Sequence, residues 1–160
     1  MANDLLVDGY VRVSWLLSVA NIAAPTTTEL NAGTQLELEY LTPKGLKVSP
    51  KTGTVDTSAL GSTFNTGRSG RREFDIELEC KRKIGVTDVA WNLFAYRSAG
   101  YVVIRRNKLA ASAWATSDQV EVYPVETMEP EQADPEENAV AKFSVGMVMT
   151  ADPNTRAVVA

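Results

Sequence analysis

The sequence predicts a mainly β fold: an antiparallel β-sandwich or barrel on which one α-helix packs. Several short segments alternate apolar and polar residues with the period of two that a half-buried strand requires, whereas one segment alone shows sustained helical spacing. The helix and the strands do not follow one another in the β-α-β order that parallel sheets need. With 160 residues, 44% of them apolar, the chain can bury the core of one domain covering residues 1–160.

The N-terminal part is expected to contain two strands separated by a short helix. In residues 11–18 every second position is apolar, from Val11 to Leu17, which predicts the first strand. Thr26 and Glu29 then have the S/T-x-x-E spacing of a capping box, and Gly33 is suited to end a single helical turn. Residues 36–40 alternate again, so we expect a second half-buried strand there.

The segment 42–72 is rich in glycine, serine and threonine and has little sustained periodicity. This composition predicts a long loop or a loose hairpin. Connections longer than about 12–15 residues are uncommon in compact domains and are usually functional or disordered. The segment is therefore a candidate interaction element.

The clearest strand follows this segment, at residues 73–81, where apolar and charged residues alternate. Cys80 falls on its apolar face, and a free cysteine there is expected to act as a small core residue rather than a reactive one. It is the sole cysteine of the sequence, so the chain cannot form an internal disulfide. The protein is thus compatible with a reducing compartment.

A helix over 87–98 is expected next, capped by Thr87 and stapled by Val86 and Trp91. Residues 101–104 are all apolar, which is typical of a strand covered on both faces. Further strands are predicted at 119–125 and 140–150, and the acidic, proline-interrupted stretch between them is expected to be a solvated loop. The termini are expected to be extended, over residues 1–9 and 151–160.

The sequence lacks the residues of most catalytic sites. Histidine is absent, which removes the commonest general base and the commonest transition-metal ligand. We also find no G-x-S-x-G elbow, no phosphate-binding glycine loop and no calcium-loop pattern. Two carboxylates could serve a glycosidase, but the acidic stretch offers nothing that desolvates them. We predict that the protein is not an enzyme and has no metal or cofactor.

Charge is distributed unevenly along the chain. The net charge of −4 disfavours non-specific binding of nucleic acid. Residues 68–108 carry ten basic and five acidic side chains, whereas residues 109–160 carry two basic and nine acidic ones. Such segregation suits a head-to-tail contact between identical chains. We expect the basic cluster to form charged strand ends or an interface. It consists of Arg68, Arg71, Arg72, Arg105, Arg106 and Lys108.

Three features in this order are similar to the major tail (tail tube) proteins of long-tailed, siphophage-type bacteriophages. Trp15 lies on the first strand and is followed by APTTTELNAGT at residues 24–34. The segment 55–64, VDTSALGSTF, lies within the expected loop. A capped helix then leads into the strand at 101–106. Together these features cover most of the chain.

The resemblance implies a structural virion protein that closes into hexameric rings, which stack as the hollow tail tube through which the genome passes. Implied partners are further copies of the chain, a tape-measure protein and a tail-terminator protein, with DNA passing through without specific binding. No membrane anchor is expected, because no apolar run approaches the roughly 18 residues of a membrane span. The protein would be assembled in the host bacterial cytoplasm and would reside in the virion tail.

In such proteins the long loop and the termini reach adjacent rings, which corresponds here to residues 42–72, 1–9 and 151–160. The alternative from another class is a monomeric binding module, such as a virion decoration or receptor-binding domain, whose long loop recognises a ligand. Oligomeric state would separate the two. The candidate contacts between subunits are Lys44, Lys47, Lys51, Asp56, Phe64, Arg68, Arg71, Arg72, Glu129, Glu131, Glu136 and Glu137.

Overall fold

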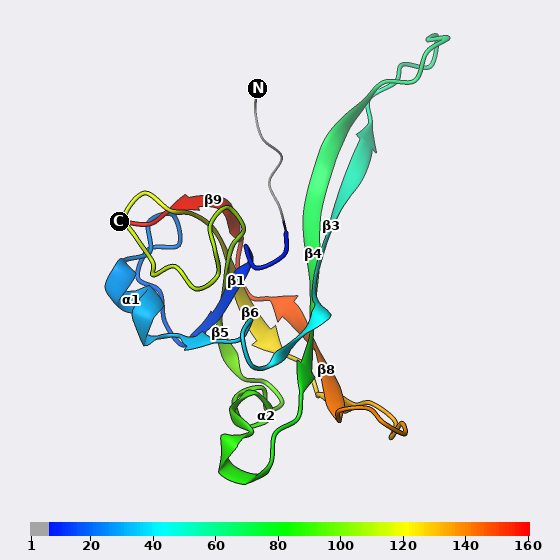
Figure 1. Ribbon diagram of the computed structural model, residues 1–160. Helices are drawn as coiled ribbons and strands as arrows, with labels where there is room; N and C mark the ends of the chain where they lie inside the picture. Colours follow the sequence, from blue (N-terminus) through cyan, green and yellow to red (C-terminus); the bar gives the residue numbers. More distant parts are fainter. Residues whose placement is uncertain (1–6) are drawn as a thin grey trace.

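The computed structural model describes residues 7–160 and is mainly β (Figure 1). Its strands all pair antiparallel within one nine-stranded sheet, and its helices are short, which confirms the predicted fold class. The elements of the described chain are β1 (Arg12–Leu16), α1 (Thr27–Ala32), β2 (Thr34–Gln35), β3 (Leu41–Asp56), β4 (Gly67–Lys81), the 3₁₀ turn η1 (Gly85–Thr87), α2 (Val89–Leu93), β5 (Ala99–Arg105), β6 (Gln119–Thr127), β7 (Glu131–Gln132), β8 (Lys142–Met149) and β9 (Asn154–Val158).

The sheet runs in the order β2-β1-β5-β6-β8-β4-β3, and strand β6 is its branch point. The first half of β6 pairs with β9, from Gln119 onward, while its second half pairs with β8, from Val125 to Thr127. Because one strand serves two neighbours in succession, the sheet splits and curls instead of continuing flat. Strand β7 is a short addition to β8.

The main core is a cluster of buried side chains from most strands of this sheet. Trp15 of β1 and Phe143 of β8 belong to the same buried cluster although β5 and β6 lie between these two strands in the sheet. Helix α2 closes the cluster: Phe94 meets Trp15 edge-to-face with ring centroids 5.2 Å apart, and Trp91 meets Phe143 at 5.1 Å. These aromatic pairs bury large apolar areas and explain why the packed helix sits there.

A second buried cluster lies beneath α1. Leu30 of the helix packs with Leu16, Val103 and Val122 of the sheet. The capping box predicted for this helix is present: the Thr26 side chain accepts the Glu29 N–H, and the Glu29 carboxylate accepts the Thr26 N–H.

The C-terminal segment 151–160 is not an extended tail, so that prediction is wrong. It forms β9 on the edge of β6, and both Ala157 and Val159 are buried. The sequence pattern of this segment is weak because only two of its side chains reach the core. For the N-terminal tail 1–9, residues 1–6 lie outside the described part of the chain.

The strand predicted at 36–40 is also wrong. Strand β2 ends at Gln35, and a turn follows in which the Leu36 carbonyl accepts the N–H groups of Tyr40 and Leu41. Leu36 is buried, but Leu38 is exposed. The two-residue alternation therefore came from a turn that buries only one of its apolar residues.

The helix predicted over 87–98 is shorter than expected. It begins after Asp88 and ends at Leu93, and Thr87 belongs to the preceding 3₁₀ turn, where its hydroxyl donates to the Ile84 carbonyl. Val86 is 94% exposed, so it does not staple the helix. The predicted strand at 73–81 and the buried position of Cys80 are confirmed. Burial raises the pKa of the Cys80 thiol to about 12.

Residues 42–72 form most of a long antiparallel hairpin. The sequence predicted either a long loop or a loose hairpin for this segment. The long loop is wrong, and the hairpin is confirmed. Strands β3 and β4 pair from Leu41↔Cys80 to Asp56↔Gly67 and project well beyond the body of the molecule (Figure 1). The periodicity was weak because both faces of the projecting part meet solvent, so no face selects apolar residues.

Candidate assembly surface

The projecting hairpin is the largest part of the described chain without a core of its own. No side chain between Lys51 and Glu73 is buried. Within the described residues β3 pairs only with β4, and β4 in turn pairs with β8 only from Ile76 to Lys81. The hairpin therefore presents two unpaired strand edges together with two exposed faces, and such edges are sites where another chain can add.

Ion pairs between the two strands hold the base of the hairpin. The Lys47 ammonium lies 3.3 Å from the Glu77 carboxylate, and Lys51 pairs with Asp75. Both pairs are solvent-exposed, so each contributes little stability. They neutralise one face of the hairpin and keep the two strands in register.

Further along the hairpin, charges remain without an ionic partner. Arg72 pairs with Asp152 at 3.0 Å, which ties the hairpin to the loop before β9. Arg68 and Arg71 form no ion pair with any other described residue, and both are exposed. This outer part of the hairpin consequently carries positive charge that the chain itself does not neutralise.

The hairpin tip, residues 57–66, is held by its own hydrogen bonds. The Thr66 N–H donates to the Ser58 hydroxyl at 2.9 Å, and the Ser62 hydroxyl donates to the Phe64 carbonyl at 2.6 Å. At the base of the tip the Asp56 carboxylate accepts the Ser58 N–H at 2.8 Å. Hydrogen bonds from the Ser58 side chain and backbone lower the pKa of Asp56.

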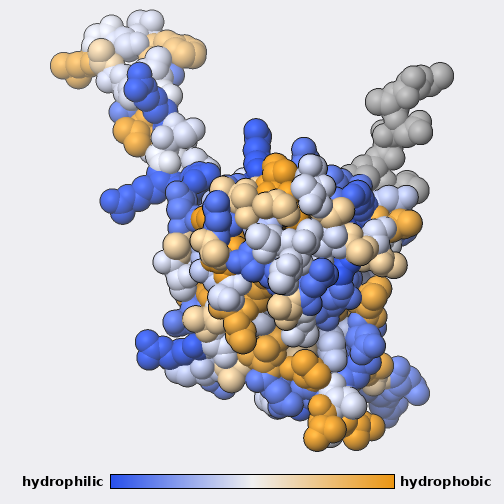
Figure 2. All heavy atoms as spheres, turned by 90° about the vertical axis from the view of Figure 1, so that its left-hand side faces the viewer, coloured by the Kyte–Doolittle hydropathy of each residue, from blue (hydrophilic) through white to orange (hydrophobic). Residues whose placement is uncertain are grey.

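Apolar side chains project from this ordered tip. Phe64 is 74% exposed, and Leu60 is fully exposed. Figure 2 shows hydrophobic atoms at the end of the projecting arm, separated from the body by the polar stem of the hairpin. Large apolar side chains on an ordered, isolated projection are typical of an interaction site.

The acidic loop, residues 128–141, lies at the opposite end of the molecule from the hairpin tip (Figure 1). It contains five acidic residues and no basic one. None of these carboxylates forms an ion pair with another described residue, and Glu131 through Val140 are exposed. The acidic residues of this loop are Glu129, Glu131, Asp134, Glu136 and Glu137.

The structure brings together the predicted contact residues in two groups. One group shares the hairpin, and the other shares the acidic loop; within one chain the two groups lie apart (Figure 1). The first group contains Lys44, Lys47, Lys51, Asp56, Phe64, Arg68, Arg71 and Arg72, and the second contains Glu129, Glu131, Glu136 and Glu137.

One member of the predicted basic cluster is not at a surface. Arg105 was expected at a charged strand end, but its side chain is fully buried and forms an ion pair with Asp118 at 2.8 Å. It also donates to the carbonyls of Leu109, Ser112 and Ala113, and so fixes the loop between β5 and β6. Sequence spacing gave no signal for this contact, because a lone arginine at the end of an apolar strand is usually exposed.

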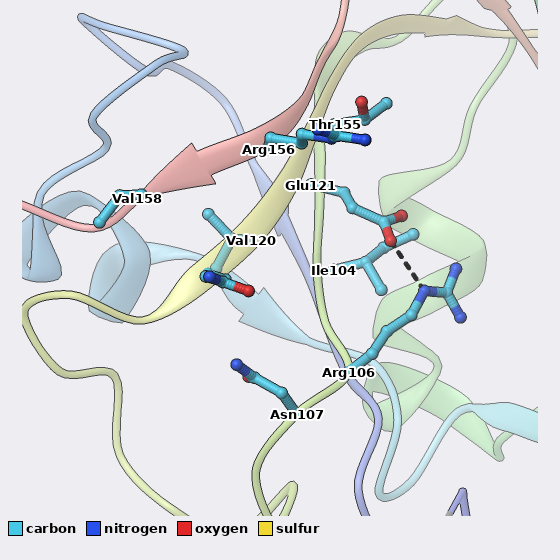
Figure 3. Close-up of a pocket in the computed structure, with 9 residues that line it drawn as sticks. Ile104, Arg106, Asn107, Val120, Glu121, Thr155, Arg156 and Val158 are labelled. Atoms are coloured by element: carbon cyan, nitrogen blue, oxygen red, sulfur yellow. Dashed lines mark hydrogen bonds and ion pairs between the residues drawn. The ribbon is translucent and has the colours of Figure 1, made fainter. Parts of the chain in front are cut away.

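The structure also has a groove of about 410 Å³ between β6, β9 and the loop after β5 (Figure 3). Its charged wall is internally neutralised, because Arg106 donates to the Glu121 carboxylate at 2.9 Å. Asn107 and Arg156 lie on other sides of the opening. No cluster of three potential metal-ligating residues is found between residues 7 and 160.

No helix in the described part of the chain is long and apolar enough to cross a membrane.

Comparison with solved structures places this fold among components of phage-like tails. It is similar to a chain of the six-fold symmetrised baseplate of the anti-feeding prophage, with a TM-score of 0.61, 11% identity and coverage of 96% of both chains. It is also similar to a chain from the tail of an empty gene transfer agent particle of C6 symmetry, with a TM-score of 0.55 and 14% identity over 90% of this chain and 93% of that chain. No curated protein matches the chain.

What the chain shares with these structures at such low identities is the fold, and it defines a mainly β protein built on one antiparallel sheet. The sequence model of the phage tail tube protein family matches residues 1–160. The chain therefore belongs to the phage tail tube protein family, which confirms the resemblance seen in the sequence. It is a structural component of a virion tail.

Proposed function

We propose that the chain, acting as one structural unit of residues 1–160, assembles with copies of itself into hexameric rings that stack as a tail tube for genome delivery. The projecting hairpin is the observation that carries this proposal. A two-stranded ribbon without a packed face is marginally stable by itself. This ribbon is long, ordered and unburied from Lys51 to Glu73, so a partner chain is needed to cover it.

Two further observations support the proposal. The similar chains come from assemblies that were described with six-fold symmetry. In addition, the unneutralised arginines of the hairpin and the unneutralised carboxylates of the acidic loop lie at opposite ends of one chain. Stacking two copies in the same orientation brings the hairpin of one toward the acidic loop of the next, which is a heterologous contact that repeats without limit.

The remaining parts of the proposal follow from the family. A tape-measure protein and a tail terminator would be the other partners, and DNA would pass through the tube without specific binding. Assembly would take place in the host cytoplasm, with no membrane anchor. No enzymatic step is proposed for the chain, because it acts through contacts with copies of itself.

The test is a shortened hairpin. Residues 53–71 are replaced by Asn-Gly, which joins the paired residues Thr52 and Arg72 through a favourable two-residue turn. Since no buried side chain is removed, we expect an unchanged melting temperature and loss of rings or tubes, measured by light scattering and negative-stain electron microscopy. The matched single variants are Arg71→Gln, expected to weaken assembly, and Arg156→Gln, an exposed arginine outside the hairpin, expected to leave it unchanged.

Two outcomes would overturn the proposal. A natural chain that stays monomeric at high concentration would favour the decoration or receptor-binding alternative. A shortened variant that still forms normal tubes would show that the hairpin does not join subunits.

A further inference from the structure

The turn around η1 exposes a second apolar surface, at the end of the molecule opposite the hairpin tip. Ile84 and Val86 are each 94% exposed. Figure 1 shows this turn at the lower end of the molecule, and Figure 2 shows hydrophobic atoms at the lowest point of the same end. We call these two side chains and the backbone that carries them the η1 corner.

The η1 corner is held firmly by the body beneath it. Arg82 Nε lies 2.5 Å from the carboxylate of Asp88, which is itself buried, so an ion pair closes the turn. The Arg82 guanidinium also lies 4.0 Å from the centre of the Trp91 ring, and Trp91 packs edge-to-face on Phe143 in the core. Because the turn is already ordered in the free chain, a partner that binds it loses little free energy in ordering it.

The backbone of the corner is shaped to direct its side chains outward. Gly85, between the two apolar residues, has a φ of +65°, a conformation that other residues rarely adopt. The Thr87 hydroxyl donates to the Ile84 carbonyl at 2.7 Å and so fixes the turn from its solvent-exposed side. A preorganised turn that presents two branched apolar side chains to water indicates a contact surface.

The occupant that fits is the hairpin tip of a second copy. The tip is likewise preorganised by internal hydrogen bonds and presents Leu60 and Phe64. The two apolar surfaces lie at opposite ends of the chain, so they cannot meet within one copy but can meet between copies stacked in the same orientation. Charge supports the same pairing: the acidic loop shares the end of the molecule with the η1 corner, and Arg68 and Arg71 lie next to the tip.

We propose that the η1 corner is the receiving surface for the hairpin tip of the adjacent copy, with Leu60 and Phe64 packing on Ile84 and Val86. This proposal rests on the self-assembly proposed above and assigns the residues that make the contact. The acidic loop lies on the other side of the same end of the molecule (Figure 1) and would receive the arginines of the hairpin stem.

Covalent capture tests the contact. The double variant Phe64→Cys with Val86→Cys is treated with a short bismaleimide under assembly conditions, and the products are separated on a denaturing gel. Since the two positions cannot meet in one chain, head-to-tail contact yields a ladder of covalent oligomers, while each single variant stops at a dimer or below. Native Cys80 is buried and does not contribute.

The matched control pairs Phe64→Cys with Leu38→Cys, because Leu38 is also strongly exposed but lies elsewhere. This pair is expected to give no ladder. If tubes form normally and the Val86 pair gives no ladder, the η1 corner is not the receiving surface, while the self-assembly proposal stands. If the natural chain does not assemble, both proposals fail.

A non-covalent measurement covers the case in which the cysteine substitutions disturb assembly. Ile84→Ser with Val86→Ser removes the apolar corner without touching the core, so folding should be unchanged. We expect the protein concentration at half-maximal assembly to rise by about tenfold or more. An unchanged midpoint in this double variant, with folding intact, contradicts the proposal.

Discussion

Arg105 shows at the residue scale how a single side chain can organise a loop. Its guanidinium is fully buried, pairs with Asp118 and donates to three backbone carbonyls, while the Trp114 ring lies 5.0 Å from it. Every one of these partners belongs to the segment between β5 and β6. Arg105 therefore ties several points of this loop together, and Arg12 adds a second contact to it through the Ser112 carbonyl.

Replacing Arg105 by methionine should destabilise the protein by about 3–5 kcal/mol. Buried Asp118 then keeps only the half-exposed Lys108 as an ionic partner among the described residues, and backbone carbonyls of the loop lose the guanidinium that donates to them. Urea unfolding at neutral pH measures the change. Arg106→Met is the matched control: the neighbouring arginine forms a surface pair with Glu121, and its loss should cost less than about 1 kcal/mol. Equal losses in the two variants would contradict the structural role of Arg105.

The same network predicts a pH dependence. Burial raises the pKa of Asp118, but hydrogen bonds from Lys108, the Ala115 N–H and Arg105 more than offset this, so the pKa is lowered. A carboxyl whose pKa is lowered by folding stabilises the fold at pH values above its pKa in the unfolded chain, which is about 3.9. This stabilisation is lost as the pH falls through the lower pKa that the carboxyl has in the folded chain. The stability difference between the natural chain and Asp118→Asn should thus be constant from pH 8 to 5 and shrink below about pH 4.

The measurement for Asp118 is a series of urea unfolding curves across this pH range. A difference that already shrinks between pH 7 and pH 5 would show that the pKa of the carboxyl is raised rather than lowered.

At the scale of elements, the close approach of the paired strands β1 and β5 depends on one glycine. A Cβ placed on Gly100 would lie 2.4 Å from Cζ2 of Trp15, which is buried, and 2.7 Å from the Leu16 carbonyl oxygen. Neither the buried indole nor the backbone can move freely. Because Gly100 has no side chain, its backbone can lie directly against the Trp15 indole while β5 pairs with β1.

Gly100→Ala should therefore destabilise the protein by about 1–3 kcal/mol or more through overpacking. Thermal and urea unfolding report this loss. Gly61→Ala in the hairpin tip is the matched control, because a Cβ there meets no atom within 4 Å, and its effect should stay within about 0.5 kcal/mol. If Gly100→Ala leaves the free energy of unfolding unchanged, the Trp15 ring can shift to make room for the methyl group.

The sequence predicts well the elements that have one solvent-exposed face and one buried face. Residues 73–81 and the capping box at Thr26 are recovered because alternation and side-chain hydrogen bonds act locally. Prediction fails where tertiary contacts decide. The turn at 36–40 imitates strand alternation, and the helix after Asp88 ends early because Phe94 turns inward to meet Trp15.

The candidate surface is predicted only in part for the same reason. Charged residues on the hairpin and on the acidic loop are visible as charge runs in the sequence. The apolar members, Leu60, Ile84 and Val86, are not, because an apolar residue in a sequence is expected to be buried. Only the structure shows that these three point to solvent.

At the scale of the whole molecule, charge separation makes assembly depend on salt. The hairpin arginines and the acidic loop would meet between copies near the surface, where attraction is screened over about 10 Å at 0.1 M salt. Raising the ionic strength from about 0.02 M to 0.5 M should weaken stacking, visible as shorter tubes by microscopy. Tube lengths that do not change over this range would show that charge complementarity is not the main organiser.

The unburied ribbon from Lys51 to Glu73 also has a consequence for the turnover of the protein. In a solitary chain, opening this stretch exposes no core, so it costs little free energy and lets a protease reach the bonds after Arg68 and Arg71. A neighbour that covers the ribbon removes that access. If the chain assembles as proposed, we therefore expect unassembled subunits to be cleaved at these bonds faster than assembled ones.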